Sequence, residues 1–204
     1  MASKVEIMNM ALVILGEQRI ASPTEDVKAA RELSAVWDIS RRALLRAYRW
    51  GFAMKRVALA ASATAPAFQF DYQYQLPADF VRLDSVGDYF VGASLTDYRT
   101  TDESAFALAN TTSGTVIETS IAPPLNVRYV ADIETTTFFD PLFTFALAAQ
   151  LAVDVAITLT NSSGKLTAAG NARGAAIGAA VMANAIERAP VPSPDDSWIL
   201  ARAS

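Results

Sequence analysis

The architecture of this chain can be worked out from residues 22–48, which read SPTEDVKAARELSAVWDISRRALLRAY. At 100° per residue, seven apolar side chains of this stretch fall on one side of a helix, with Ser40 as the single polar interruption. They are Ala29, Leu33, Val36, Trp37, Leu44, Ala47 and Tyr48. Ser22 can cap the start, Pro23 suits the first helical position, and Glu25 completes a capping box. The stretch therefore predicts one long amphipathic helix with its apolar face on a core.

The opposite face of this predicted helix is charged. It carries Lys28, Arg31, Asp38, Arg42, Arg46 and Arg49, five cations and one anion. We expect this basic strip to point away from the helix's own fold, with Arg42, Arg46, Arg49 and Asp38 as candidates for contact with a neighbouring subunit. A solvated surface is the simpler alternative. A small DNA-binding helical protein, resting on the same arginines, is a third.

Composition excludes several classes of chemistry. The 204 residues include no cysteine and no histidine, which removes disulfides, thiolate metal sites, the common catalytic triads and the most frequent metal ligand. We expect no cofactor. A net charge of −4 argues against a protein whose purpose is to hold nucleic acid by neutralising phosphates. The hydrophobic fraction of 52% favours burial of some apolar surface against other subunits.

Neither a membrane span nor a secretory leader is expected. The most apolar segment, Leu142 to Leu159, contains Gln150 and Asp154, and no uninterrupted apolar run approaches the roughly 20 residues that cross a bilayer. Residues 1–16 carry early charges and do not end in a small-residue cleavage site. The sequence therefore predicts an intracellular protein with no membrane partner.

Two more helices have clear boundary signals. Val5 to Leu15 has apolar residues at helical spacing, and Gly16 follows where a left-handed residue would stop the helix. Asp140 and Pro141 form a cap and first-position pair before a helix from Leu142 to Thr160. Both are expected to belong to the same bundle as the long helix.

A fourth helix is expected at roughly Lys165 to Arg188. Gly170, Gly174 and Gly178 recur there at four-residue spacing, although each glycine weakens an isolated helix by about 1 kcal/mol relative to alanine. Such a row makes sense where another helix must come close. The alternative is a loosely specified surface helix rich in alanine and glycine.

Asp154 is the candidate for a buried ion pair. Its helix is apolar almost all round, which predicts an interior helix, and a buried carboxylate needs a partner. An arginine from the long helix or from a neighbouring subunit is the obvious candidate. The rival idea, a catalytic acid, lacks a second acidic group at a nearby helical position.

Between the second and third helices the hydrophobic period changes from 3.6 to 2. Residues 68–76 alternate apolar and polar side chains, which is the clearest strand signal in the chain. Further strands are expected at 81–86, 89–91, 115–121 and 125–131, with turns at 87–88 and 110–114. The pattern predicts a small antiparallel β module at 61–133.

The last segment, 189–204, has proline at alternate positions, which forbids a helix and favours an extended arm. It carries an apolar group, Trp198, Ile199 and Leu200, which we interpret as a docking peptide; packing against its own domain is the alternative. The predicted fold class is α+β, mostly α. Residues 1–60 and 134–188 form a helical bundle, the β module is inserted, and the arm is at the C-terminal end.

Several runs of the chain, in this order, resemble the head-to-tail adaptor proteins of tailed bacteriophages, often called tail tubular protein A in short-tailed phages. They are ALVILGE at 11–17, LLRAYRWGFAMKRVALA at 44–60, YQYQLPADFVRLDSV at 72–86, LNVRYVADIETTTFFDPLFTFALAAQLAVDVAITLT at 125–160 and DSWILAR at 196–202. Residues 88–119 show no family pattern. The matching runs are helix, strand and packing signatures and carry no catalytic motif.

The resemblance implies a structural protein of the virion at the head-tail junction, which passes through the host cytoplasm during assembly. Members of the family form a dodecameric ring under the portal protein, extend the channel through which double-stranded DNA passes, and join a tail nozzle or another tail protein. Family adaptors reach the portal with C-terminal segments, and the matching residues here are Trp198, Ile199 and Leu200. The resemblance therefore implies a connector and not an enzyme.

A tail-associated cell-wall hydrolase is the alternative function. Asp and Glu are the only obvious proton carriers in the chain, and glycosidases work with paired carboxylates. Adjacent pairs such as Asp195-Asp196 and Asp102-Glu103 are explained more simply as solvated loops.

Overall fold

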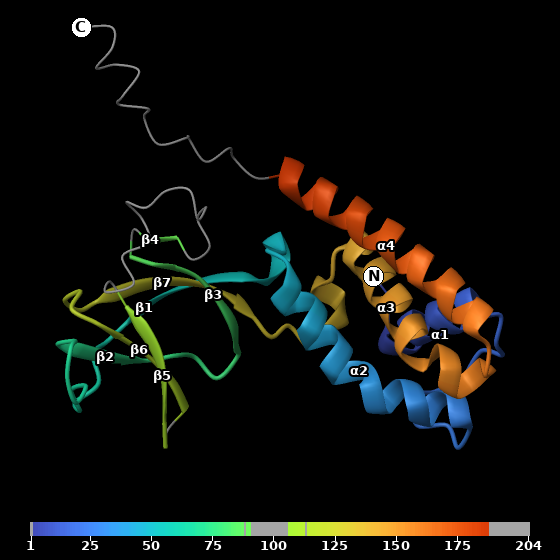
Figure 1. Ribbon diagram of the computed structural model, residues 1–204, viewed down its shortest axis with the longest axis horizontal. Coiled ribbons are helices and arrows are strands. Elements are labelled where there is room, and N and C mark those ends of the chain that lie inside the picture. The colour runs from blue at the N-terminus through green and yellow to red at the C-terminus, as the bar shows by residue number, and fades with distance from the viewer. Residues whose placement is uncertain (1, 88, 91–105, 113, 188–204) are drawn as a thin grey trace, which may run out of the picture.

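The computed structural model describes residues 2–87, 89–90, 106–112 and 114–187. A helical bundle and a β module lie next to each other, and the C-terminal end of α2 is the part of that helix nearest the module (Figure 1). The four helices are α1 (Lys4–Leu15), α2 (Lys28–Ala47), α3 (Pro141–Thr160) and α4 (Ser163–Ile186). The predicted α+β, helix-rich class is confirmed. The extended arm at 189–204, with Trp198, Ile199 and Leu200, lies outside the described residues.

The ends of α1 and α3 follow the local signals. Ser3 and Glu6 form a reciprocal capping box at the start of α1, and Gly16 ends that helix in the left-handed conformation with φ 65°. The Asp140 carboxylate accepts from the backbone N–H of Leu142 at 2.7 Å, with Pro141 as the first helical residue. These caps confirm two predicted helices almost to the residue.

The start of α2 differs from the prediction. The helix begins at Lys28, after Val27, whose side chain provides no cap. The hydroxyl of Ser22 accepts from the backbone N–H of Thr24, and the Glu25 carboxylate accepts from the backbone N–H of Ala21. The expected capping box is therefore wrong, because both side chains close a local turn before the helix.

The bundle core is built around α3, which packs against α1, α2 and α4. Leu33 and Trp37 of α2 are buried there, and Trp50 donates from its ring nitrogen to the carbonyl oxygen of Leu44 at 2.8 Å. Trp50 also meets Phe143 edge to face, with ring centroids 5.0 Å apart. Trp37 and Trp50 are therefore core anchors of the bundle.

By length and composition, α3 is the one helix among the described residues that could cross a membrane. The core helix of a soluble protein passes the same test, and 56% of its most apolar window is buried inside the subunit. Phe145 and Ile157 are nevertheless exposed. The prediction of an entirely interior helix is therefore wrong on one side of α3.

The β module contains two antiparallel sheets. One sheet has the order β1-β7-β3-β4 and the other β2-β6-β5. Their bounds are β1 Met54–Leu59, β2 Tyr72–Gln75, β3 Phe80–Val86, β4 Tyr89–Phe90, β5 Ala107–Thr111, β6 Gly114–Thr119 and β7 Leu125–Ala131. Side chains from both sheets, among them Tyr74, Leu83, Ile117 and Val127, share one small core. This core is separate from that of the bundle.

The boundaries of the module differ from those predicted. Residues 54–59, assigned to the bundle, form β1 and pair with β7 along its length. The alternating stretch 68–76 gives only the short strand β2, because Gln69 takes a positive φ of 75° and Phe68 is exposed. The β module therefore begins at Met54 and not at residue 61.

Helix α4 lies on the outside of the bundle. Gly170, Gly174 and Gly178 are exposed, and a Cβ added at any of them would meet nothing within 4 Å. No helix among the described residues comes close to that row. Within the described chain, the Ala/Gly-rich surface helix is the correct interpretation.

Candidate functional site

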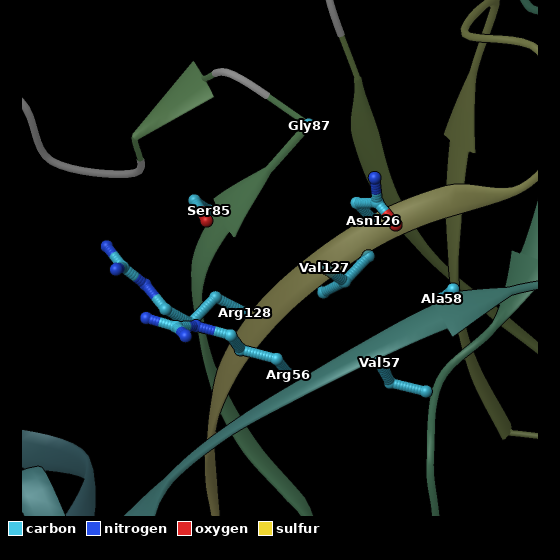
Figure 2. A pocket seen from close by; sticks show the side chains of 8 residues that line it. All are labelled: Arg56, Val57, Ala58, Ser85, Gly87, Asn126, Val127 and Arg128. Carbon is cyan, nitrogen blue, oxygen red and sulfur yellow. The ribbon is translucent and has the colours of Figure 1, made fainter.

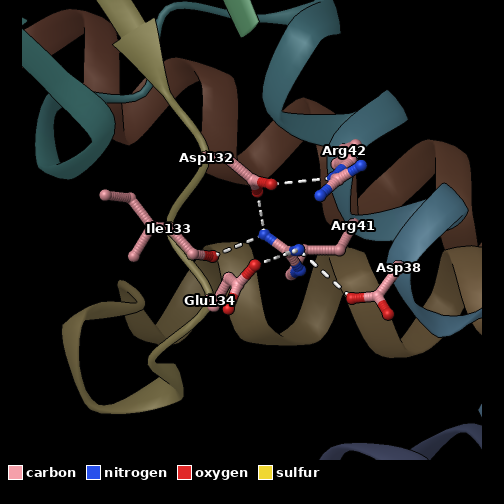
Figure 3. A network of polar contacts seen from close by, with 6 residues as sticks. All are labelled: Asp38, Arg41, Arg42, Asp132, Ile133 and Glu134. Atoms are coloured by element: carbon pink, nitrogen blue, oxygen red, sulfur yellow. Dashed lines mark hydrogen bonds and ion pairs between the residues drawn. The ribbon is translucent and has the colours of Figure 1, made fainter. Parts of the chain in front are cut away.

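The junction between bundle and module is held by a buried arginine. Arg41 of α2 has a fully buried side chain and forms an ion pair with Asp132, directly after β7 (Figure 3). It also donates to the carbonyl oxygen of Ile133 at 2.8 Å and to the Asp38 carboxylate at 3.2 Å. Several charge-assisted bonds from one guanidinium thus tie the helix to the end of the sheet.

Asp132 also binds a second arginine. Nε of Arg42 donates to its other carboxylate oxygen at 2.7 Å, so Asp132 sits between two consecutive arginines of α2. Glu134 lies at the edge, with a carboxylate oxygen 4.0 Å from Arg41. We call Asp38, Arg41, Arg42, Asp132 and Glu134 the junction network. It fixes the direction of α2 relative to the β module.

A second cluster forms where the chain leaves α2. Asp84 of β3 is almost fully buried and accepts from Arg49 at 2.6 Å; Arg128 of β7 binds the same carboxylate. The pairing of β3 with β7 shifts register between Leu83 and Ser85, so Asp84 is the extra residue of a β-bulge. The bulge turns the carboxylate toward the helical side of the sheet.

A second register shift on β3 also brings the strand into contact with an arginine of α2. It lies between Phe80 and Arg82, and the carbonyl oxygen of Val81 accepts from Arg46 at 2.5 Å. Arg82 lies among the same arginines. Partial burial lowers the pKa of its guanidinium, and the positive charges of Arg49 and Arg46 lower it further, whereas the negative charge of Asp84 raises it. The end of α2 and the bulged strand thus gather several arginines around one buried carboxylate.

Arg42 and Arg46 lie on α2 as predicted and Arg49 follows the helix end at Ala47, but for these three arginines the predicted direction is wrong. Arg42, Arg46 and Arg49 do not point away from their own fold; each binds the β module of the same chain. Asp38 is largely exposed and pairs with Arg41. An intersubunit role for these residues stays a prediction, and it now has to compete with contacts inside the subunit.

Asp154 is also placed differently from the prediction. It is exposed on α3 and binds two neutral partners, the hydroxyl of Ser40 at 2.5 Å and the side-chain amide of Gln150 at 2.8 Å. No arginine of the described chain pairs with it. The expected buried ion pair is therefore wrong, because Asp154 lies on the exposed side of α3, beside Ser40 of α2.

An apolar groove lies on the surface of the bundle, between α1 and α3. Its largest exposed side chains are Val13, Ile14 and Phe145, which are 53%, 36% and 55% exposed. Glu6 and Arg19 stand on its polar rim. We call this surface the α1/α3 groove.

Sequence reasoning missed the main residues of the junction. Arg41 carries a recognisable signal, because Leu33, Trp37, Arg41 and Leu45 recur every fourth residue and all four are buried. Asp84 and Asp132 carry none, since each lies on or next to a strand whose partner helix is tens of residues away in the chain.

Metal binding and proton transfer can be judged from the acidic side chains of the described residues. No group of three or more acidic side chains among them could hold a metal ion. Hydrogen bonds from the Ser3 backbone and hydroxyl lower the pKa of Glu6. Partial burial opposes ionisation of Asp79, but hydrogen bonds from Lys55 and Tyr129 outweigh it and lower its pKa. Both changes favour the charged carboxylate, whereas a general acid needs the protonated form.

The chain was compared with protein-family models and with curated proteins. No protein-family model matches the chain, and no curated protein matches it either.

Proposed function

We propose that this chain is a structural head-to-tail adaptor of a bacteriophage virion. In this role it forms a ring under the portal, extends the DNA channel and joins the capsid to the tail. The protein works by geometry and multivalent contact and performs no reaction. The proposal rests on the resemblance of its sequence runs and on the surfaces of the subunit described above.

The observation that carries the proposal is the α1/α3 groove. Exposed apolar side chains from two rigid helices form a surface that a solitary subunit does not need, and its rim carries both signs of charge. A closed ring requires two different complementary surfaces on each subunit. The groove supplies one of them, and the next copy in the ring is its occupant.

The junction network supports the same role. A connector must keep its two halves in a fixed relation while each half meets a different neighbour. Arg41 and Asp132 join the bundle and the β module through a buried ion pair, which sets orientation more than it adds stability. The bundle and module can therefore act as one rigid unit between portal and tail.

The hydrolase alternative has less support. Asp38, Asp132 and Glu134 are the acidic groups that gather at the junction, and Arg41 lies among all three. Their charges serve the ion pairs that hold the subunit together. The acidic pairs at 102–103 and 195–196 lie outside the described residues, and a peptidoglycan-release assay with the purified protein tests them directly.

The proposal is tested by mixing the protein with purified portal rings and measuring particle masses by mass photometry. We expect many copies to join each portal ring, and Phe145→Glu to abolish ring closure because it places a charge in the α1/α3 groove. Phe138→Glu is the matched control, since Phe138 is a similarly exposed phenylalanine outside the groove. Failure of the unaltered protein to bind portal would overturn the proposal, and ring closure by Phe145→Glu would remove the groove from it.

A further inference from the structure

One face of the β1-β7-β3 sheet carries a row of polar side chains. Arg56 pairs in register with Arg128, and Arg128 pairs in register with Ser85, so these three residues form one row across three strands. The neighbouring row holds Ala58 and Asn126, with Gly87 bonded to the Asn126 carbonyl oxygen. The small side chains of that second row leave a surface hollow beside the arginines (Figure 2).

Among the described residues, the hollow is lined by two arginines and by no acidic side chain. Like charges placed directly opposite each other on a sheet are unfavourable, and the ion pair between Arg128 and Asp84 offsets part of the repulsion between Arg56 and Arg128. Arg56 is exposed and makes no hydrogen bond or ion pair with any described residue. The carboxylate of Asp84 already pairs with Arg128 and Arg49. Arg56 therefore has a free guanidinium held against a second one by strand register.

We propose that this hollow binds a phosphate group. The Arg56 guanidinium can donate to two oxygens of a tetrahedral oxyanion beside the positive charge of Arg128, and a doubly charged phosphate relieves the repulsion between the two arginines. The hydroxyl of Ser85 and the side-chain amide of Asn126 add neutral donors at the same hollow. The hollow is open to solvent, so the phosphate can belong to a free phosphate compound or to a nucleic-acid backbone.

This inference does not depend on the adaptor function. Arg56 and its neighbours are far from the α1/α3 groove in the subunit, and phosphate binding can be measured on the full chain without any portal protein. A protein that fails to join portal rings can still bind phosphate, and the reverse also holds.

The test is calorimetric titration of the full-length protein with inorganic phosphate in a low-salt buffer without phosphate. We expect binding by the unaltered protein and a loss of affinity of about tenfold or more in Arg56→Gln, because a charge-assisted contact is removed. Arg173→Gln is the matched control: Arg173 is an exposed arginine on α4 without a described partner, and its replacement leaves affinity unchanged.

A second titration uses a short DNA duplex in place of inorganic phosphate. Binding that depends on Arg56 and weakens with added salt assigns the phosphate to a nucleic-acid backbone; binding of inorganic phosphate alone assigns it to a free phosphate compound. Either result supports the site. The proposal is overturned if neither probe binds, if Arg56→Gln binds as well as the unaltered protein, or if citrate binds as tightly as phosphate.

Discussion

Replacing Arg41 by methionine tests whether the junction depends on a buried charge. Methionine fills much of the arginine stem's volume but donates no hydrogen bond, so the change removes the ion pair with Asp132 and the bond to the Ile133 carbonyl. Breaking a buried ion pair by removing one partner costs about 3–5 kcal/mol. Asp132 keeps Arg42 at 2.7 Å, which offsets part of this cost. We therefore expect a loss near the lower end, about 3 kcal/mol.

The assay is urea unfolding at neutral pH, followed by tryptophan fluorescence and circular dichroism. With a slope of roughly 2 kcal/mol per molar urea, the expected loss moves the midpoint down by about 1.5 M. Arg42→Met is the matched control, because Arg42 binds the same carboxylate from an exposed position and should cost under about 1 kcal/mol. Equal losses in the two variants would refute the idea that the buried guanidinium holds the junction.

Three further predictions follow from other contacts. Arg56→Glu should stabilise the protein by up to about 1 kcal/mol at low salt, since it replaces repulsion by Arg128 with attraction; a thermal melt that shows destabilisation contradicts this. Burial and the hydrogen bond to Asp79 raise the pKa of Tyr129 to about 12, so its contribution to stability is complete below pH 10 and is lost as pH rises through 12. A difference titration at 295 nm against Tyr129→Phe measures the pKa of Tyr129, and an ordinary value near 10 would contradict this prediction. Deleting residues 189–204 should leave the melting temperature nearly unchanged and abolish portal binding, whereas a deletion variant that fails to fold would place that segment in the core.

Strong local signals made α1 and α3 predictable. Gly16 stops α1, and the Asp140 side chain with Pro141 starts α3, so each boundary is decided by residues within one turn of it. The start of α2 shows the limit of this reasoning. Ser22 and Glu25 have the right spacing for a capping box, but Glu25 bonds to the backbone before it and closes a turn.

Strands that depend on a partner were harder to predict. Residues 54–59 lack a clear alternation of apolar and polar side chains and become a strand because β7 offers its free edge. Residues 107–111 are rich in alanine and asparagine, which have low strand propensity, and pair with β6 in a hairpin. Such segments follow their neighbours more than their own composition.

The arginines of the junction could be predicted from the sequence, but their partners could not. The helical wheel separates the apolar face of α2 from its arginines, but it cannot say whether solvent, another subunit or the same chain covers the charged side. Asp84 and Asp132 reach that side through the β-bulge on β3 and the end of β7. The contact of Asp84 with Arg49, just after α2, spans 35 residues of sequence, and that of Asp132 with Arg42 of α2 spans 90, so no local pattern predicts them.

The most direct test of the adaptor proposal is electron microscopy of the protein mixed with portal rings, with the number of subunits and their orientation as the measurement. The proposal predicts a closed dodecameric ring coaxial with the portal, with the α1/α3 groove of each subunit covered by the next copy. Portal rings that stay bare, beside subunits that remain single at every concentration, would contradict it.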